Sequence, residues 1–149
     1  MTIIQEFVAD LLLNPTDGKL QNDLLEQMYQ EKSLEALLPL LVPGTSESVL
    51  LAGLFVVDEL GARATGQFAL VRPLGLDPSP FVRARVADIA ANCWRDVNDS
   101  DLRLLAGWLD SDEPLLVRRS AFALLSFLNR LAGLLPLSGG VRQNGLADL

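Results

Sequence analysis

The chain has 149 residues, half of them apolar, a formal net charge of −7 and a single cysteine. This length fits one domain, and the apolar share is large enough to build a core without metals or disulfide bonds. The sequence contains no histidine, which excludes Ser-His-Asp and Cys-His catalysis and removes the commonest metal ligand. We therefore expect a protein that is not an enzyme and that has neither a cofactor nor a metal site.

Residues 1–32 predict a pair of helices. In the first, apolar residues recur at helical spacing, and Thr2 with Gln5 forms a capping-box pattern at its start. Pro15 ends this helix, because the residue before a proline disfavours the helical conformation. The second helix places four apolar residues on one face: Leu20, Leu24, Leu25 and Met28. The N-terminal end of the chain lacks the basic region of a secretory signal.

From Ser33 onwards the pattern changes to units of a short helix, a turn and a longer helix. The predicted short and long helices cover residues 33–41 and 46–61, then 67–74 and 81–94, then 101–109 and 113–131. No stretch alternates as a strand would, which predicts an all-α fold. The longest apolar run, residues 49–57, is too short to span a bilayer and indicates a central helix covered on both sides.

The units repeat with a fixed period. Val49, Val82 and Val117 stand at the same place in each long helix, with spacings of 33 and 35 residues. A period of this size is typical of solenoids, in which neighbouring helical hairpins must stack because one hairpin alone cannot bury its apolar face.

These units resemble HEAT repeats. The segment 37–41, Leu-Leu-Pro-Leu-Leu, is similar to the first helix of such a repeat, and 77–83 and 112–118 each run from a turn aspartate to a helix arginine. The resemblance implies a right-handed α-α superhelix with three repeats over residues 33–131, a divergent N-terminal pair over 1–32, and a tail or cap over 132–149. It also implies a hydrogen-bonded ladder between repeats, made by Asp77, Arg83, Asp112 and Arg118. The first unit departs from this pattern, with Gly44 and Leu50 in the corresponding places.

Negative charge is concentrated in the N-terminal part. Residues 1–60 hold ten acidic residues and two lysines, whereas the remaining residues hold nine acidic residues and ten arginines. An acidic surface attracts basic proteins and repels nucleic acid. On this basis we expect partner contacts at Asp23, Glu26, Asp58 and Glu59. The alternative is a solvated helix surface that only keeps the protein soluble.

The predicted function is therefore a non-catalytic protein-binding module in the cytoplasm, with no membrane or nucleic-acid partner. A small acidic solenoid resembles the HEAT-like immunity proteins of bacterial toxin systems, which implies a basic toxin domain as the partner that is bound and neutralised. Two alternatives stay open: an enzyme accessory or lyase of the HEAT-like kind, and a structural adaptor of a larger complex.

Several conspicuous side chains are interpreted as structural. Cys93, Trp94 and Trp108 are expected in the core, since a free cysteine is usually buried and tryptophans usually pack. Asp58 and Glu59 are adjacent on a helix and diverge too far to act as a carboxylate pair. The acidic residues Asp96, Asp99 and Asp101 lack the glycine and the terminal glutamate of a calcium loop.

Overall fold

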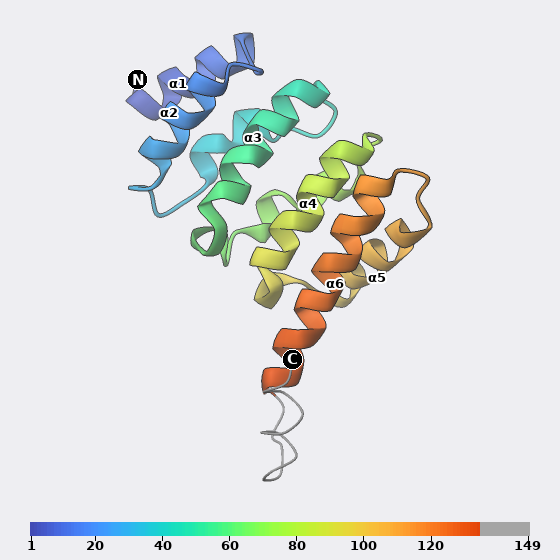
Figure 1. The fold of residues 1–149 in the computed structure, drawn as a ribbon. Coiled ribbons are helices and arrows are strands. Elements are labelled where there is room, and N and C mark those ends of the chain that lie inside the picture. The colour runs from blue at the N-terminus through green and yellow to red at the C-terminus, as the bar shows by residue number, and fades with distance from the viewer. Residues whose placement is uncertain (135–149) are drawn as a thin grey trace.

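The structure, a computed structural model, describes residues 1–134, which are all-helical and contain no strand (Figure 1). From residue 135 on, the expected tail or cap lies outside the described residues. None of the described helices combines the length and the apolar character needed to cross a membrane.

The helices lie in two layers. One layer, the long-helix layer, holds four helices side by side: α2 (Gly18–Met28), α3 (Glu47–Leu60), α4 (Pro80–Asn92) and α6 (Pro114–Leu134). The other layer holds α1 (Ile3–Leu13), α5 (Asp99–Gly107) and a series of short 3₁₀ helices: η1 (Glu35–Leu40), η2 (Gly61–Ala64), η3 (Phe68–Leu70), η4 (Arg72–Leu76), η5 (Trp94–Asp96) and η6 (Trp108–Asp110). The chain passes from one layer to the other in each unit, so successive units stack along the molecule.

Helix starts follow the capping signals of the sequence. The Thr2 hydroxyl accepts from the Gln5 N–H, and the Gln5 side chain accepts from the Thr2 N–H, which completes the expected capping box. Ser79 caps α4 with Pro80 at the first helical position, as predicted. A second capping box, formed by Asn98 and Asp101, starts α5.

Two of the three predicted short helices are 3₁₀ helices in the structure, and both lie in the second layer. The segment 33–41 contributes only η1, which contains Pro39, and the segment 67–74 is split between η3 and η4. Pro39 and Pro73 lack the N–H group that an α-helix needs, and Gly75 lies next to Leu104 and Trp108, where little space remains. Tight 3₁₀ turns satisfy the backbone over these short distances.

The third unit is shifted by one residue against the predicted alignment. The long helices begin at Glu47, Pro80 and Pro114, spacings of 33 and 34 residues. The residue of α6 that corresponds to the buried Val49 and Val82 is therefore Leu116, which is completely buried, and not Val117, which is half-buried.

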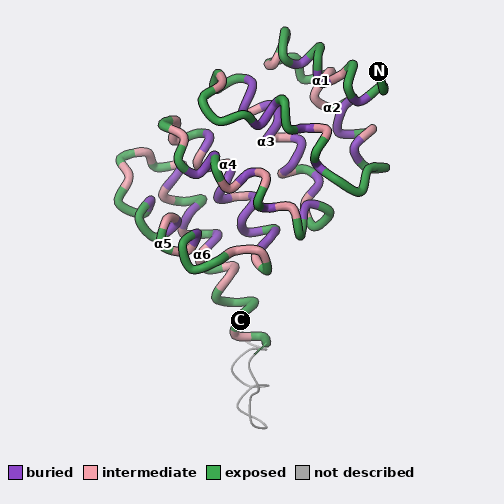
Figure 2. Tube along the Cα trace, turned by 180° about the vertical axis from the view of Figure 1, so that it is seen from behind, coloured by how far each residue is buried: buried purple, intermediate pink, exposed green. Residues whose placement is uncertain are grey.

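The core runs continuously between the two layers, as the buried segments in Figure 2 show. Its centre is α3, which packs against α2, α4 and η1 and buries most of the apolar run 49–57, as expected. Cys93 and Trp108 are buried as predicted, whereas Trp94 is only half-buried. The side chains of Leu51 and Phe55 escape full burial and face a groove on the outer surface of the long helices.

Candidate functional site

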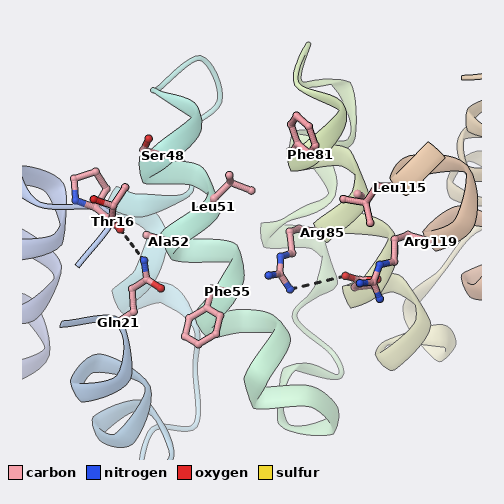
Figure 3. A pocket seen from close by; sticks show the side chains of 13 residues that line it. Thr16, Gln21, Ser48, Leu51, Ala52, Phe55, Phe81, Arg85, Leu115 and Arg119 are labelled. Atoms are coloured by element: carbon pink, nitrogen blue, oxygen red, sulfur yellow. Dashed lines mark hydrogen bonds and ion pairs between the residues drawn. The ribbon is translucent and has the colours of Figure 1, made fainter. Parts of the chain in front are cut away.

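A groove of about 380 Å³ crosses the outer surface of the long-helix layer (Figure 3). Its lining comes from α3, α4, α6, the start of α2 and the turn before α2: Pro15, Thr16, Gln21, Ser48, Leu51, Ala52, Phe55, Phe81, Ala84, Arg85, Asp88, Leu115 and Arg119. Because each helix adds one row of side chains, the groove exists only when the repeats are stacked.

Apolar side chains form much of the groove. Leu51 and Phe55 of α3, Phe81 of α4 and Leu115 of α6 all line it, and Phe81 is 43% exposed. At the α2 end, the Gln21 side chain donates to the Pro15 carbonyl at 2.7 Å, which holds the turn between α1 and α2 against the groove (Figure 3). An open apolar surface next to fixed polar groups is typical of a binding site.

A ladder of alternating charges crosses the same surface from α3 to α6. Arg85 Nη1 lies 3.0 Å from Asp58 Oδ2 and 3.9 Å from Asp88 Oδ2, and Arg119 Nε lies 3.7 Å from Asp88 Oδ1. The Asn92 amide also donates to Asp58 at 3.4 Å. These pairs join three neighbouring helices, and we call Asp58, Arg85, Asp88 and Arg119 the charge ladder.

In the charge ladder, burial disfavours the charged form of the two carboxylates more strongly than the nearby arginines favour it. The pKa of Asp58 and that of Asp88 are both raised above the ordinary value, chiefly because desolvation disfavours the charged form. The nearby guanidinium groups lower both pKa values but do not compensate for this effect. The charge ladder therefore fixes how the helices align, and it adds little net stability.

This leads to a prediction on pH. For an acid with a raised pKa in the folded state, stability increases as the pH falls through that pKa, because the folded state then binds more protons than the unfolded state. We expect a variant carrying Asp58→Asn and Asp88→Asn to lose this gain. The measurement is the free energy of unfolding from pH 7 down to pH 4, compared with Glu26→Gln, a substitution at an exposed acid of α2 that does not act on either carboxylate. A double variant whose pH profile matches that of the wild type in this range would contradict the assignment.

The ladder predicted from the HEAT resemblance is not formed by the expected pairs. Asp77 accepts from the Ser79 N–H at 2.9 Å, and Arg83 Nε is buried without a hydrogen-bond partner among residues 1–134. Asp112 and Arg118 are exposed, and neither joins an ion pair within the described range. The one-residue shift of the third unit explains the difference for Arg118, since it places Val117 at the position of Arg83.

The arginines that do join neighbouring long helices are Arg85 and Arg119, which occupy the same position in α4 and α6, 34 residues apart. This role was not predicted from the sequence for either of them. Each one pairs with an acid on the preceding long helix. The spacing of 34 residues is visible in the sequence, but the pairing is not, because Asp58 and Asp88 are not at equivalent positions of α3 and α4.

The four expected partner contacts have different surroundings. Glu26 and Glu59 are exposed, and Glu59 follows the groove residue Phe55 by one helical turn on the same face. Asp23 pairs with Lys19 at 2.7 Å, and Asp58 belongs to the charge ladder. None of the four lines the groove: Asp58 lines the neighbouring cavity with Arg85 and Asp88, Glu59 lies one turn beyond the groove residues of α3, and Asp23 and Glu26 lie on α2.

The described residues hold no cluster of three or more Cys, Asp and Glu side chains that could bind a metal. Burial raises the pKa of the Cys93 thiol to about 11, so at neutral pH this cysteine is a neutral thiol rather than a nucleophilic thiolate. The groove itself offers hydroxyl, amide, guanidinium and carboxylate groups next to apolar side chains. Such a lining suits recognition of a ligand by shape and charge.

Comparison with models of protein families, with curated proteins and with solved structures found no match to this chain. The class that the fold itself defines is an all-helical protein of stacked units with a groove across its long helices.

Proposed function

We propose that this chain is a protein-binding module that holds a segment of a basic partner in the groove across α2, α3, α4 and α6. The observation that carries the proposal is the groove itself, where Phe55, Phe81 and Leu115 stand beside the charge ladder on a surface built by stacked helices. Aromatic and aliphatic anchors surrounded by polar groups are the usual composition of a binding surface.

The charge distribution supports a basic partner. Glu59 lies on the groove face of α3, Glu26 is exposed on α2, and the first 60 residues carry a net charge of −8. In the proposal these acids accelerate association by long-range attraction, whereas the apolar side chains of the groove hold the complex together.

The finer reading is a short HEAT-like right-handed superhelix of the immunity type, which binds a basic toxic domain in the cytoplasm and neutralises it without catalysis. Two layers of helices with units of 33 and 34 residues support the solenoid part. The acidic N-terminal part supports the choice of partner.

The test compares two apolar side chains of nearly equal exposure. Phe81 lies in the groove and is 43% exposed, whereas Leu109 lies in η6 of the other layer and is 41% exposed. We expect the tagged full chain to recover one basic protein in stoichiometric amount from its native cell extract. Phe81→Ala should weaken binding of that purified protein at least tenfold, the effect of removing a buried aromatic anchor, and Leu109→Ala should leave binding unchanged.

Salt provides the second readout. The association rate should fall as ionic strength rises, and a double variant with Glu26→Gln and Glu59→Gln should reduce both the rate and its salt dependence. The proposal fails if no stoichiometric protein is recovered in repeated trials, or if Phe81→Ala binds as tightly as Leu109→Ala.

A further inference from the structure

A separate polar cavity of about 300 Å³ lies where α3 and α4 end and the second half of α6 passes. We call it the Trp94 notch, and its lining is Ala62, Thr65, Asn92, Trp94, Arg95 and Arg130. Asn92 also lines the cavity beside the charge ladder, so the notch opens at the far end of the same surface as the groove.

Two guanidinium groups stand against one aromatic ring in the Trp94 notch. The Cζ atoms of Arg95 and Arg130 lie 5.1 and 5.9 Å from the centroid of the Trp94 ring, which is close enough for a cation–π contact with each. Neither arginine forms an ion pair or a side-chain hydrogen bond with another residue in 1–134. The hydrogen-bonding edges of both guanidinium groups are therefore available to a ligand.

A comparable arginine elsewhere in the molecule is anchored. Arg63 stacks on Tyr29 at 4.7 Å, and its Nη1 also donates to the Tyr29 carbonyl at 2.8 Å. Such an arginine links two neighbouring units. Arg95 and Arg130 also stack on an aromatic ring, but neither donates a hydrogen bond to an acceptor within residues 1–134.

Two acids close to the lining of the Trp94 notch, Asp58 beside Asn92 and Asp96 next to Arg95 in the chain, have partners outside the notch. Asp58 pairs with Arg85, and the Asp96 carboxylate accepts from the Gly66 N–H. Arg95 and Arg130 form no ion pair with an acid of residues 1–134, and two positive charges that share one ring repel each other, so an anion that contacts both would be bound favourably. Thr65 and Asn92 add a hydroxyl and an amide group to the lining.

We propose that the Trp94 notch binds a phosphate group, either as free phosphate or as a phosphate monoester. A guanidinium group presents parallel N–H donors that match two oxygens of a phosphate, and a tetrahedral dianion has enough oxygens to engage two such groups. A carboxylate carries one charge and two oxygens, so it offers the two arginines less charge and fewer acceptor sites than a phosphate does. This site is independent of the groove and of the partner proposed for it.

The test is a titration of the full chain at constant ionic strength, followed by tryptophan fluorescence. Trp94 forms part of the site, and Trp108 is buried in the other layer, so a change on binding reports Trp94. The probes are inorganic phosphate, phenyl phosphate and acetate. We expect a saturable change with both phosphates and a much weaker one with acetate at the same concentration. Tighter binding of phenyl phosphate would identify a monoester as the preferred form, and equal binding would identify the phosphate group alone.

Variants connect the signal to the site. Arg95→Gln and Arg130→Gln should each weaken phosphate binding about tenfold, as expected for the loss of a charge-assisted hydrogen-bonding partner. Arg103→Gln, at an exposed arginine of α5 without an ion pair in the described range, should have no effect. The proposal is overturned if acetate gives the same response as phosphate, or if Arg95→Gln and Arg130→Gln behave like Arg103→Gln.

Discussion

Replacing Asp101 by alanine is expected to lower the free energy of unfolding by about 3 kcal/mol, the scale for removing one partner of a buried ion pair. The Asp101 carboxylate has an exposed fraction of 9% and accepts from Arg72 Nε at 3.0 and 3.2 Å and from Arg72 Nη2 at 3.1 Å. It also accepts from the Asn98 N–H at 3.0 Å as part of the capping box of α5.

Arg72 shows why the loss should be large. Its Nη2 also donates to the Asp96 carbonyl at 3.0 Å, and its guanidinium group lies 5.2 Å from the centre of the Phe68 ring, so the side chain is held in place. Without Asp101, a positive charge that is only 35% exposed loses its counter-charge. The capping box of α5 also loses the side chain that accepts from the Asn98 N–H, while Asn98 itself still caps the helix.

Chemical denaturation of the full chain measures this effect. The matched control is Asp110→Ala, since Asp110 is an exposed aspartate at the end of the same hairpin and joins no ion pair within residues 1–134. Its substitution should change stability by no more than about 0.5 kcal/mol. If Asp101→Ala and Asp110→Ala differ by less than 1 kcal/mol, the pair with Arg72 does not hold η4 to α5.

The second large effect is expected at Gly53. Within a helix, glycine to alanine normally stabilises by up to about 1 kcal/mol. At Gly53 in α3 the sign should reverse, because an added Cβ would lie 2.8 Å from Leu40 Cβ, 2.9 Å from Leu41 Cδ2 and 3.0 Å from the Leu40 carbonyl oxygen. Relief of these contacts requires η1 to move away from α3, and we expect a loss of about 2 kcal/mol from overpacking.

Gly107 provides the opposite case. It ends α5 with helical backbone angles, and an added Cβ would meet no atom within 4 Å. Gly107→Ala should therefore raise the free energy of unfolding by about 0.5 kcal/mol, as helix propensity predicts. Thermal and chemical denaturation of the two variants should shift in opposite directions. A Gly53→Ala variant as stable as Gly107→Ala would mean that η1 does not pack on α3 as closely as described.

Local signals in the sequence predicted much of the fold. Thr2 with Gln5, Pro15, and Ser79 with Pro80 mark helix boundaries within a few residues of the chain, and the structure confirms each of them. The apolar run 49–57 indicated a helix covered by its neighbours, and α3 is that helix. Caps and apolar periodicity depend on residues close together in the chain, which is why one sequence is enough to read them.

Contacts between units could not be predicted in the same way. The charge ladder joins residues 27 and 31 positions apart, Asp58 to Arg85 and Asp88 to Arg119, and a shift of one residue in the third unit was enough to direct the prediction to Arg83 and Arg118 instead. The close approach of η1 to Gly53 and the pair of Arg72 with Asp101 were also absent from the predictions, since no local pattern encodes them.

The sequence by itself therefore determined the all-helical class, the order of the units, the positions of the caps and the acidic character of the first 60 residues. Only the tertiary structure decided which charges meet, where the groove lies, and that Arg95 and Arg130 share the ring of Trp94. The physical reason is that helix formation follows from neighbours three and four residues apart, whereas a site between stacked helices depends on the register of one helix against the next.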